Sequence, residues 1–158
     1  MDRSRLAKFI DQRVGALPLA KPVFLSPEDS VRTAVKRMHL DARSCVLAVE
    51  EEKLVGIFTE RDVLTRCMFD DFDWDQSLYP ELLTRDPVTI SVATTVGDAI
   101  ALMQRHNYRT LPVVDNDGAV IGLVRLGELL QHFAESFPEE VLNLPPRPHQ
   151  VVSKREGG

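Results

Sequence analysis

The sequence is short of the features that mark secreted, membrane-spanning or nucleic-acid-binding proteins. It has two cysteines, Cys45 and Cys67, which are too few and too far apart for a CxxC or zinc pattern, so we expect reduced thiols in a cytoplasmic protein. No apolar run approaches the roughly 18 residues of a membrane-spanning helix, and residues 1–12 lack the apolar core of a secretory signal. The net charge of −5 argues against binding to a nucleic-acid backbone.

Motifs of catalysis and metal binding are also missing. There is no GxxxxGK phosphate loop and no GxGxxG motif. The histidines at 39, 106, 132 and 149 have no metal-ligand spacing. Ser44 beside Cys45 suggests a nucleophile, but Cys45 lies in an apolar run with no neighbouring base in sequence. We therefore predict no catalytic residue, no metal site and no required cofactor.

What the sequence does contain is an internal repeat. Residues 21–38 (KPVFLSPEDSVRTAVKRM) resemble residues 86–103 (DPVTISVATTVGDAIALM) at an offset of 65. Residues 43–64 match residues 109–130 at an offset of 66, which places Gly56 on Gly122. A one-residue insertion near a helix-to-strand junction explains the change of offset. The chain therefore contains two copies of one structural unit.

Each copy predicts the order β-α-β-β-α. The first copy predicts strands over 22–25, 44–49 and 53–58 and helices over 26–38 and 60–69; the second predicts strands over 87–90, 110–115 and 119–124 and helices over 95–103 and 126–137. We expect Ser26 to cap the first helix and Thr94 or Thr95 to cap its counterpart. Residues 115–118 (DNDG) are a strong hairpin signal, and residues 50–53 (EEEK) are a poorer one.

One copy alone would leave one face of its sheet uncovered. We therefore predict an α+β fold in which two β-α-β-β-α repeats pack sheet to sheet with pseudo-twofold symmetry, leaving two related clefts. The expected divisions are an N-terminal helix (1–17), repeat one (18–69), an acidic linker (70–85), repeat two (86–137) and a Pro-rich, partly disordered tail (138–158). Phe72, Trp74 and Tyr79 either anchor the linker to the core or dock a partner.

The two copies, with GIFTERD at 56–62 and RTLPVVDNDGAVIG at 109–122, resemble a pair of CBS domains, also called a Bateman module. The resemblance covers residues 18–134 and implies a non-enzymatic regulatory module that binds AMP, ADP or ATP between its repeats. It also implies a homodimer that regulates an unknown protein in trans, without nucleic acid or membrane. A ligand-free interaction scaffold and an S-adenosylmethionine binder are the alternatives, and a nucleotide hydrolase would need a base or metal that we do not find.

The family's nucleotide motif is Gly, two apolar residues, Thr or Ser, two variable residues and Asp, and residues 56–62 match it in full. From the local pattern alone, Thr59 and Asp62 form a helix cap. The resemblance implies that Asp62 also accepts hydrogen bonds from a ribose diol and that Thr59 donates to a sugar or phosphate oxygen. The other ligand-binding residues it implies are Ile57 and Phe58 from the motif, Val88, Ile90, Thr110, Leu111 and Pro112 around the adenine, and Arg43 and Arg109 at the phosphates. The alternatives are that Arg43 belongs to a turn at residues 41–44 (DARS), and that Arg109 is a surface arginine or the partner of an acid such as Asp115.

The second copy departs from this motif. Arg125 stands where Thr59 stands in the first copy, and Glu128 stands in place of Asp62. Arg125 either fills the second cleft or reaches a phosphate. We therefore expect one competent site, and a second, altered site built from Val23, Cys45, Arg125 and Glu128. The preferred adenosine compound, the number of occupied sites and the regulated protein stay open at this point.

Overall fold

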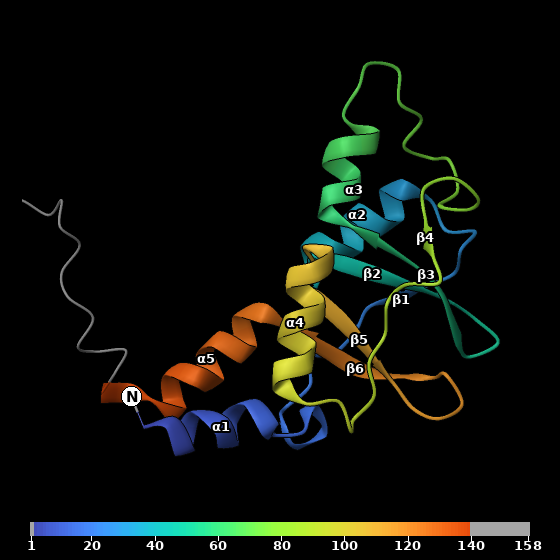
Figure 1. The fold of residues 1–158 in the computed structure, drawn as a ribbon. Helices are drawn as coiled ribbons and strands as arrows, with labels where there is room; N and C mark the ends of the chain where they lie inside the picture. The colour runs from blue at the N-terminus through green and yellow to red at the C-terminus, as the bar shows by residue number, and fades with distance from the viewer. Residues whose placement is uncertain (1, 140–158) are drawn as a thin grey trace, which may run out of the picture.

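The structure, a computed structural model, describes residues 2–139, so nearly all of the predicted tail lies outside the described residues (Figure 1). The helices are α1 (Arg3–Asp11), α2 (Val31–Leu40), α3 (Glu60–Asp62), α4 (Val96–His106) and α5 (Leu126–Ser136), with a 3-10 turn η1 (Val14–Ala16) and a π-helical turn η2 (Val63–Cys67). The strands are β1 (Phe24–Leu25), β2 (Cys45–Glu50), β3 (Lys53–Thr59), β4 (Thr84–Arg85), β5 (Thr110–Val114) and β6 (Val120–Arg125). The α+β fold and the tandem order of elements are as predicted.

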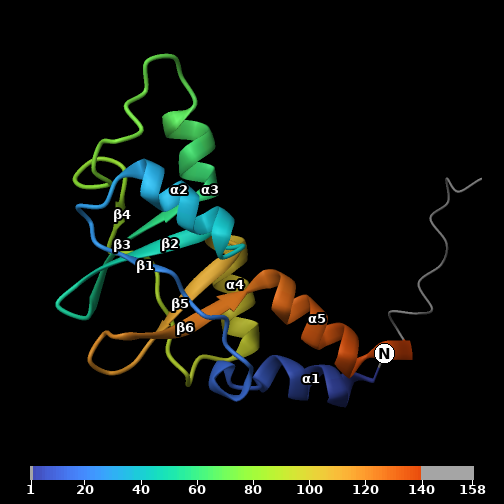
Figure 2. The ribbon, with the colours of Figure 1, turned by 180° about the vertical axis from the view of Figure 1, so that it is seen from behind.

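The two repeats have the same sheet topology. In repeat one the strand order is β1-β2-β3-β4, with β1 parallel to β2 and the other pairs antiparallel. In repeat two, β5 and β6 pair antiparallel, and isolated bridges extend them on both sides, from Ile90 to Val113 and from Ala20 to Leu123. The strand predicted at 87–90 is therefore reduced to the single bridge at Ile90. Figures 1 and 2 show repeat one above repeat two, with α2 and α3 at the top and α1 and α5 at the bottom.

The edge strand of each sheet comes from the segment that precedes or begins the other repeat in sequence. The β4 strand precedes repeat two in sequence but pairs with β3 of repeat one. Ala20 lies just before β1 at the start of repeat one but exchanges two backbone hydrogen bonds with Leu123 of β6, at 2.8 and 2.9 Å. The two copies are thus interlocked through their backbones, a feature that the sequence repeat does not predict.

Equivalent glycines make room for these crossed edges. A Cβ at Gly56 would lie 3.2 Å from the Cβ of Leu83, and one at Gly122 would lie 2.6 Å from the Cβ of Leu19. Both neighbours belong to the segment that enters from the other repeat. Close approach of backbone is a common reason for glycine inside a strand, which explains why the two copies share this position.

The sheets are buried on both faces. Along β2, Val46 and Ala48 lie in the core of repeat one, which α2 covers. Cys45 and Leu47 point the other way, into a layer that also contains Leu123. This alternation follows from the two-residue period of a strand, and double burial explains why β2 reads as one apolar run. The predicted sheet-to-sheet packing is therefore present, and we name the shared layer the inter-repeat layer (Ala20, Cys45, Leu47, Leu123).

Segments outside the repeats cover the rest of the core. Phe9 of α1 and Val14 of η1 are buried in the core of repeat two, where the Phe9 ring meets that of Phe133 at a centroid distance of 5.4 Å. In the linker, Phe72 is buried in repeat one and its ring lies 4.9 Å from that of Trp74. Phe72 and Trp74 therefore anchor the linker, as one of the two interpretations predicted, whereas Tyr79 is 44% exposed and lies outside the core.

The predicted cap of the first helix is wrong. Ser30, not Ser26, is the N-cap of α2, and its side chain accepts a hydrogen bond from the Thr33 amide. The linker explains the difference, because it bonds the backbone before the helix: the Tyr79 amide donates to the Pro27 carbonyl and the Val31 amide to that of Gln76. The cap of α4 is Thr95, as predicted.

The helix predicted over 60–69 is also different. It has α geometry only over α3 and then widens into η2, which ends at the fully buried Cys67. Its thiol lies 3.8 Å from the Asp62 carbonyl oxygen, five residues back. Single π turns occur often at functional sites, and this one directly follows Asp62.

The turn of the β2–β3 hairpin gives a first testable prediction. Glu51 and Glu52 have φ of 47° and 64°, and they form the two-residue loop between the paired Glu50 and Lys53. Positive φ at both positions favours Asn-Gly over two glutamates. We expect the double substitution Glu51→Asn, Glu52→Gly to raise the free energy of unfolding by about 1–2 kcal/mol in urea titrations.

A matched control removes the same two charges without changing the turn preference. The variant Glu51→Gln, Glu52→Gln should stay within about 0.5 kcal/mol of the wild type. Equal stabilisation of both variants would show that charge, rather than backbone conformation, limits this turn.

Candidate functional site

Thr59 and Asp62 form a complete capping box where β3 meets α3. The Thr59 hydroxyl oxygen accepts a hydrogen bond from the Asp62 amide at 3.3 Å. In return, Oδ2 of Asp62 accepts hydrogen bonds from the Thr59 amide at 2.8 Å and from the Thr59 hydroxyl at 2.9 Å. The local interpretation of this motif as a cap is therefore confirmed, and any ligand must bind to what the cap leaves free.

The cap leaves Oδ1 of Asp62 available. The nearest cation is Arg66, whose Nη1 lies 3.8 Å from Oδ1. That same nitrogen donates a hydrogen bond of 2.8 Å to the Leu82 carbonyl oxygen. The Asp62 side chain is 16% exposed, and both hydrogen bonds to its carboxylate within the described residues are to Oδ2, not Oδ1. A carboxylate oxygen in this state has the lone pairs to accept two hydrogen bonds.

Arg66 was not among the site residues predicted from the sequence, although its spacing from Asp62 could have indicated it. Arginine four residues after an aspartate on a helix is a standard ion-pair spacing. The second contact of Arg66, to Leu82 of the linker, is a long-range feature that no local pattern predicts. Through it, the linker helps to fix the position of the charge beside Asp62.

The equivalent position in repeat two is arranged differently. Arg125 is the N-cap of α5 but makes no side-chain capping hydrogen bond. Its Nη2 donates instead to Oε1 of Glu128 at 2.9 Å, with 32% and 35% of the two side chains exposed. Its Nε is buried without a hydrogen-bond partner among the described residues. The carboxylate that corresponds to Asp62 is thus hydrogen-bonded at 2.9 Å to an arginine at the cap position, where Asp62 bonds to Thr59, which supports the expectation that the second site is altered.

Cys45 lies beside these two caps in the inter-repeat layer. It pairs with Thr59 across the β2–β3 ladder and is 3% exposed. Burial raises the pKa of the Cys45 thiol to about 11, and the positive charges of Arg125 and then Arg43 partly oppose that rise. The thiol is therefore neutral at physiological pH and unsuited to nucleophilic attack.

The other predicted ligand-binding residues fall into buried and accessible groups. Those with little or no exposed side chain are Val23, Phe58, Ile90, Leu111 and Pro112. Ile57, Val88 and Thr110 are partly exposed, and Arg109 is exposed. The buried residues can contact a ligand only through backbone atoms or the small exposed part of their side chains. Most direct side-chain contacts with a ligand would therefore come from the accessible residues.

The two arginines expected at the phosphates differ in their surroundings. Nε of Arg43 donates to the Lys21 carbonyl oxygen at 2.9 Å, which favours the interpretation of Arg43 as part of a turn. The Arg109 carbonyl oxygen accepts from the Leu126 amide at 2.8 Å, which places Arg109 beside the altered cap of α5. The Arg109 side chain forms none of the ion pairs found within residues 2–139 and is free to meet an anion.

Residues 2–139 contain no group of three or more His, Cys, Asp or Glu side chains placed to hold a metal ion. In the same part of the chain, every helix is too short or too polar to cross a membrane.

A family model and a curated relative of this chain both carry the description of one domain family. The family model described as the CBS domain matches the chain twice, over residues 14–68 and 80–135. The CBS domain-containing protein CBSCBSPB1 of Arabidopsis thaliana is 33% identical over 104 residues, which are 66% of this chain and 19% of that protein. The chain spans 19%, 27% and 53% of the length of this and two further curated relatives.

Solved structures agree with this match. The CBS domain structure of NE2398 is 33% identical and superimposes with a TM-score of 0.66, covering 72% of this chain and 88% of that one. The CBS domain pair of protein MJ0100, solved in complex with 5'-methylthioadenosine and S-adenosyl-L-methionine, is 25% identical with a TM-score of 0.67. That alignment covers 78% of this chain and 96% of the MJ0100 chain.

Proposed function

The chain belongs to the CBS-domain family, and we propose that it is a non-enzymatic regulatory module that binds an adenosine-containing ligand beside Asp62. The observation that carries this proposal is the geometry of that carboxylate: Oδ2 is held by the cap, while Oδ1 is partly buried and available. The adenosine compounds in the structure of the related MJ0100 pair support the ligand class.

In this proposal the cap orients the carboxylate and the ribose uses its free oxygen. The two ribose hydroxyls donate to Oδ1 of Asp62, and hydrogen bonds to a charged group contribute about 1.5–3 kcal/mol each. Thr59 positions the Asp62 carboxylate rather than binding the ligand, because its hydroxyl already donates to Oδ2 of Asp62. The carboxylate is thus held in place before the ligand arrives, which lowers the entropy cost of binding.

The rest of the ligand would lie across both repeats. We place the adenine against Ile57 of repeat one and Val88 and Thr110 of repeat two, the accessible members of the predicted set. Backbone groups next to Ile90, Leu111 and Pro112 would form hydrogen bonds with the edge of the adenine ring. Arg109 would meet a 5′ phosphate, which favours AMP, ADP or ATP over S-adenosylmethionine.

Signalling would follow from a ligand that touches both repeats. A ligand shifts an equilibrium between two arrangements only as far as its affinities for them differ. We propose that the arrangement is read by a regulated protein and transmitted through a homodimer. Leu64 and Leu130 are equivalent positions on η2 and α5 and are 69% and 67% exposed, so a second copy could cover both.

Titration calorimetry of the purified chain with AMP, ADP, ATP and S-adenosylmethionine tests the proposal. We expect binding of at least one of them at one molecule per chain, with the nucleotides ahead of S-adenosylmethionine. Absence of heat from all four at millimolar concentration would favour the ligand-free scaffold, in which the Arg125–Glu128 pair would mark a lost site.

The second site gives a further prediction. The double substitution Arg125→Thr, Glu128→Asp removes the ion pair and restores the nucleotide motif after Gly122. We expect the stoichiometry of nucleotide binding to rise from one to two per chain in calorimetry, because the new acid has no arginine to pair with. Glu128→Asp alone serves as the control and should leave the stoichiometry at one, since Arg125 remains. An unchanged stoichiometry in the double variant would show that Arg125 does not close the second cleft.

A further inference from the structure

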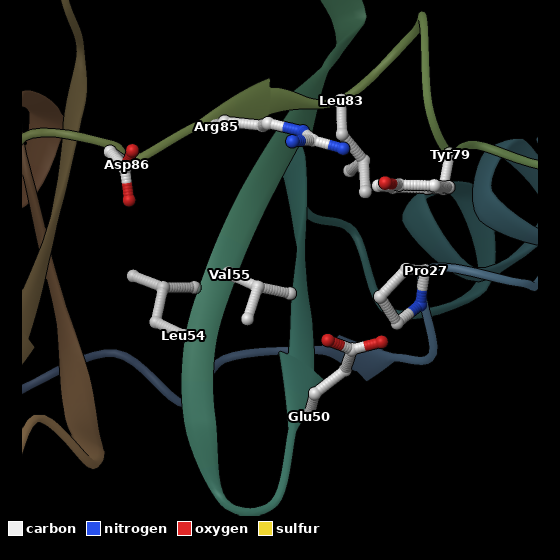
Figure 3. Close-up of a pocket in the computed structure, with 8 residues that line it drawn as sticks. All are labelled: Pro27, Glu50, Leu54, Val55, Tyr79, Leu83, Arg85 and Asp86. Atoms are coloured by element: carbon white, nitrogen blue, oxygen red, sulfur yellow. The ribbon is translucent and has the colours of Figure 1, made fainter.

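A hollow of about 310 Å³ lies at the hairpin end of the repeat-one sheet (Figure 3). Thr59 and its cap are at the opposite end of β3 from that hairpin. Val55 and Leu83 form part of its floor, and both belong to or pack on the repeat-one core rather than the inter-repeat layer. Small-molecule sites have volumes of roughly 300–1,000 Å³, so this hollow suits a ligand at the small end of that range. It is distinct from the position proposed for adenosine.

The hollow presents both signs of charge around an apolar floor. Figure 3 shows the Arg85 side chain along one side, the Glu50 carboxylate pointing in from the opposite side, and Asp86 at the end of β4. These three residues form none of the ion pairs present among the described residues. The Arg85 guanidinium instead stacks on the Tyr79 ring, 4.5 Å from its centroid. The arginine is thus held against Tyr79 and is paired with neither acid.

A ligand carrying both charges would complete this arrangement. The planar guanidinium of Arg85 matches a carboxylate, which it binds through two parallel hydrogen bonds. Glu50 and Asp86 would accept hydrogen bonds from an ammonium group. Leu54 and Val55 offer apolar surface to the rest of the molecule. We propose that this hollow binds a free α-amino acid with an apolar side chain.

Two other ligand classes fit less well. A nucleotide brings two or more negative charges, which would meet two carboxylates and one arginine, and it is large for the volume. A simple alkyl amine would satisfy Glu50 and Asp86 but would leave Arg85 without an anion. An α-amino acid is smaller than a nucleotide, and its two charged groups can interact with all three charged side chains.

The test uses the full chain and a small set of probes. Calorimetry is run with L-leucine, L-valine, L-methionine and L-phenylalanine, then with isoamylamine and 4-methylpentanoate, which lack the carboxylate and the amine of leucine respectively. We expect at least one amino acid to bind at millimolar concentration or better. Where leucine binds, each truncated analogue should bind at least about tenfold more weakly, because one charge-assisted contact is lost.

Variants locate the binding. Arg85→Gln, and separately Glu50→Gln with Asp86→Asn, should each weaken the amino acid at least about tenfold. Arg32→Gln is the control, because Arg32 pairs with the exposed Asp75 outside the hollow, and it should bind normally. AMP titration into Arg85→Gln should match the wild type, which separates this site from the adenosine site. No binding by any of the four amino acids, equal binding of isoamylamine, or unchanged affinity in both variants would overturn the proposal.

Discussion

Adenylate affinity falls by at least about ten- to hundredfold when Asp62 is replaced by alanine, because the ribose hydroxyls lose the ionised oxygen that accepts them. The expected size follows from losing charge-assisted hydrogen bonds at a side chain that is only 16% exposed. Asp62→Asn should lose most of the affinity as well, since the amide keeps the shape of the carboxylate without its charge. Calorimetry with AMP at fixed salt measures both variants.

The control must account for the cap, because Asp62→Ala also breaks the capping box. Thr95→Ala removes a threonine cap elsewhere in the fold, at the start of α4, where the Thr95 side chain accepts from the Asp98 amide at 3.1 Å. Loss of a cap costs about 1 kcal/mol of stability. Thr95→Ala should therefore lower stability comparably and leave AMP affinity unchanged. Equal affinity in Asp62→Ala and Thr95→Ala would show that Asp62 is only a cap.

The second large effect concerns the inter-repeat layer. Leu47 has no exposed surface and lies there with Cys45 and Leu123. Truncating a fully buried leucine to alanine costs about 2–5 kcal/mol, through lost burial and the cavity that remains. We expect Leu47→Ala to lower the free energy of unfolding by that amount in urea titrations, and both repeats to unfold together because the layer joins them.

Leu40→Ala provides a matched control for this substitution. Leu40 ends α2 and is 67% exposed, so the same chemical change should alter stability by no more than about 0.5 kcal/mol. If the two variants lost equal stability, or if Leu47→Ala unfolded one repeat while the other stayed folded, the inter-repeat layer would not be what holds the copies together.

The parts of the fold that follow from local periodicity were predictable. Apolar runs that predict strands, and helices with an apolar stripe such as Val96, Ala99 and Met103, occur in both copies, and the structure buries these three positions as expected. The hairpin at 115–118 also follows from local chemistry: Oδ1 of Asp115 accepts from the Ala119 amide, and Gly118 takes a φ of 83°. Duplication then implied the pairing of two half-covered sheets.

The parts that depend on long-range backbone contacts were not predictable. Helix α2 is capped by Ser30 instead of Ser26 because the linker forms backbone hydrogen bonds with the residues around the helix start. The bonded residues are more than forty positions apart in sequence. The crossed edges arise from a single-residue bridge at Ala20 and a two-residue pairing at β4, both too short to leave a pattern in the sequence. In the candidate site, the Thr59–Asp62 box could be found from its spacing, whereas the contact of Arg66 with Leu82 could not.

The most direct test of the adenosine proposal is a crystal structure of the chain grown with AMP. The proposal requires ribose density within hydrogen-bond distance of Oδ1 of Asp62, with Oδ2 still bonded to Thr59 and with the base lying between Ile57 and Val88. Density for AMP elsewhere, or an empty cleft with the Asp62 carboxylate bonded only to its own cap at saturating AMP, would contradict it.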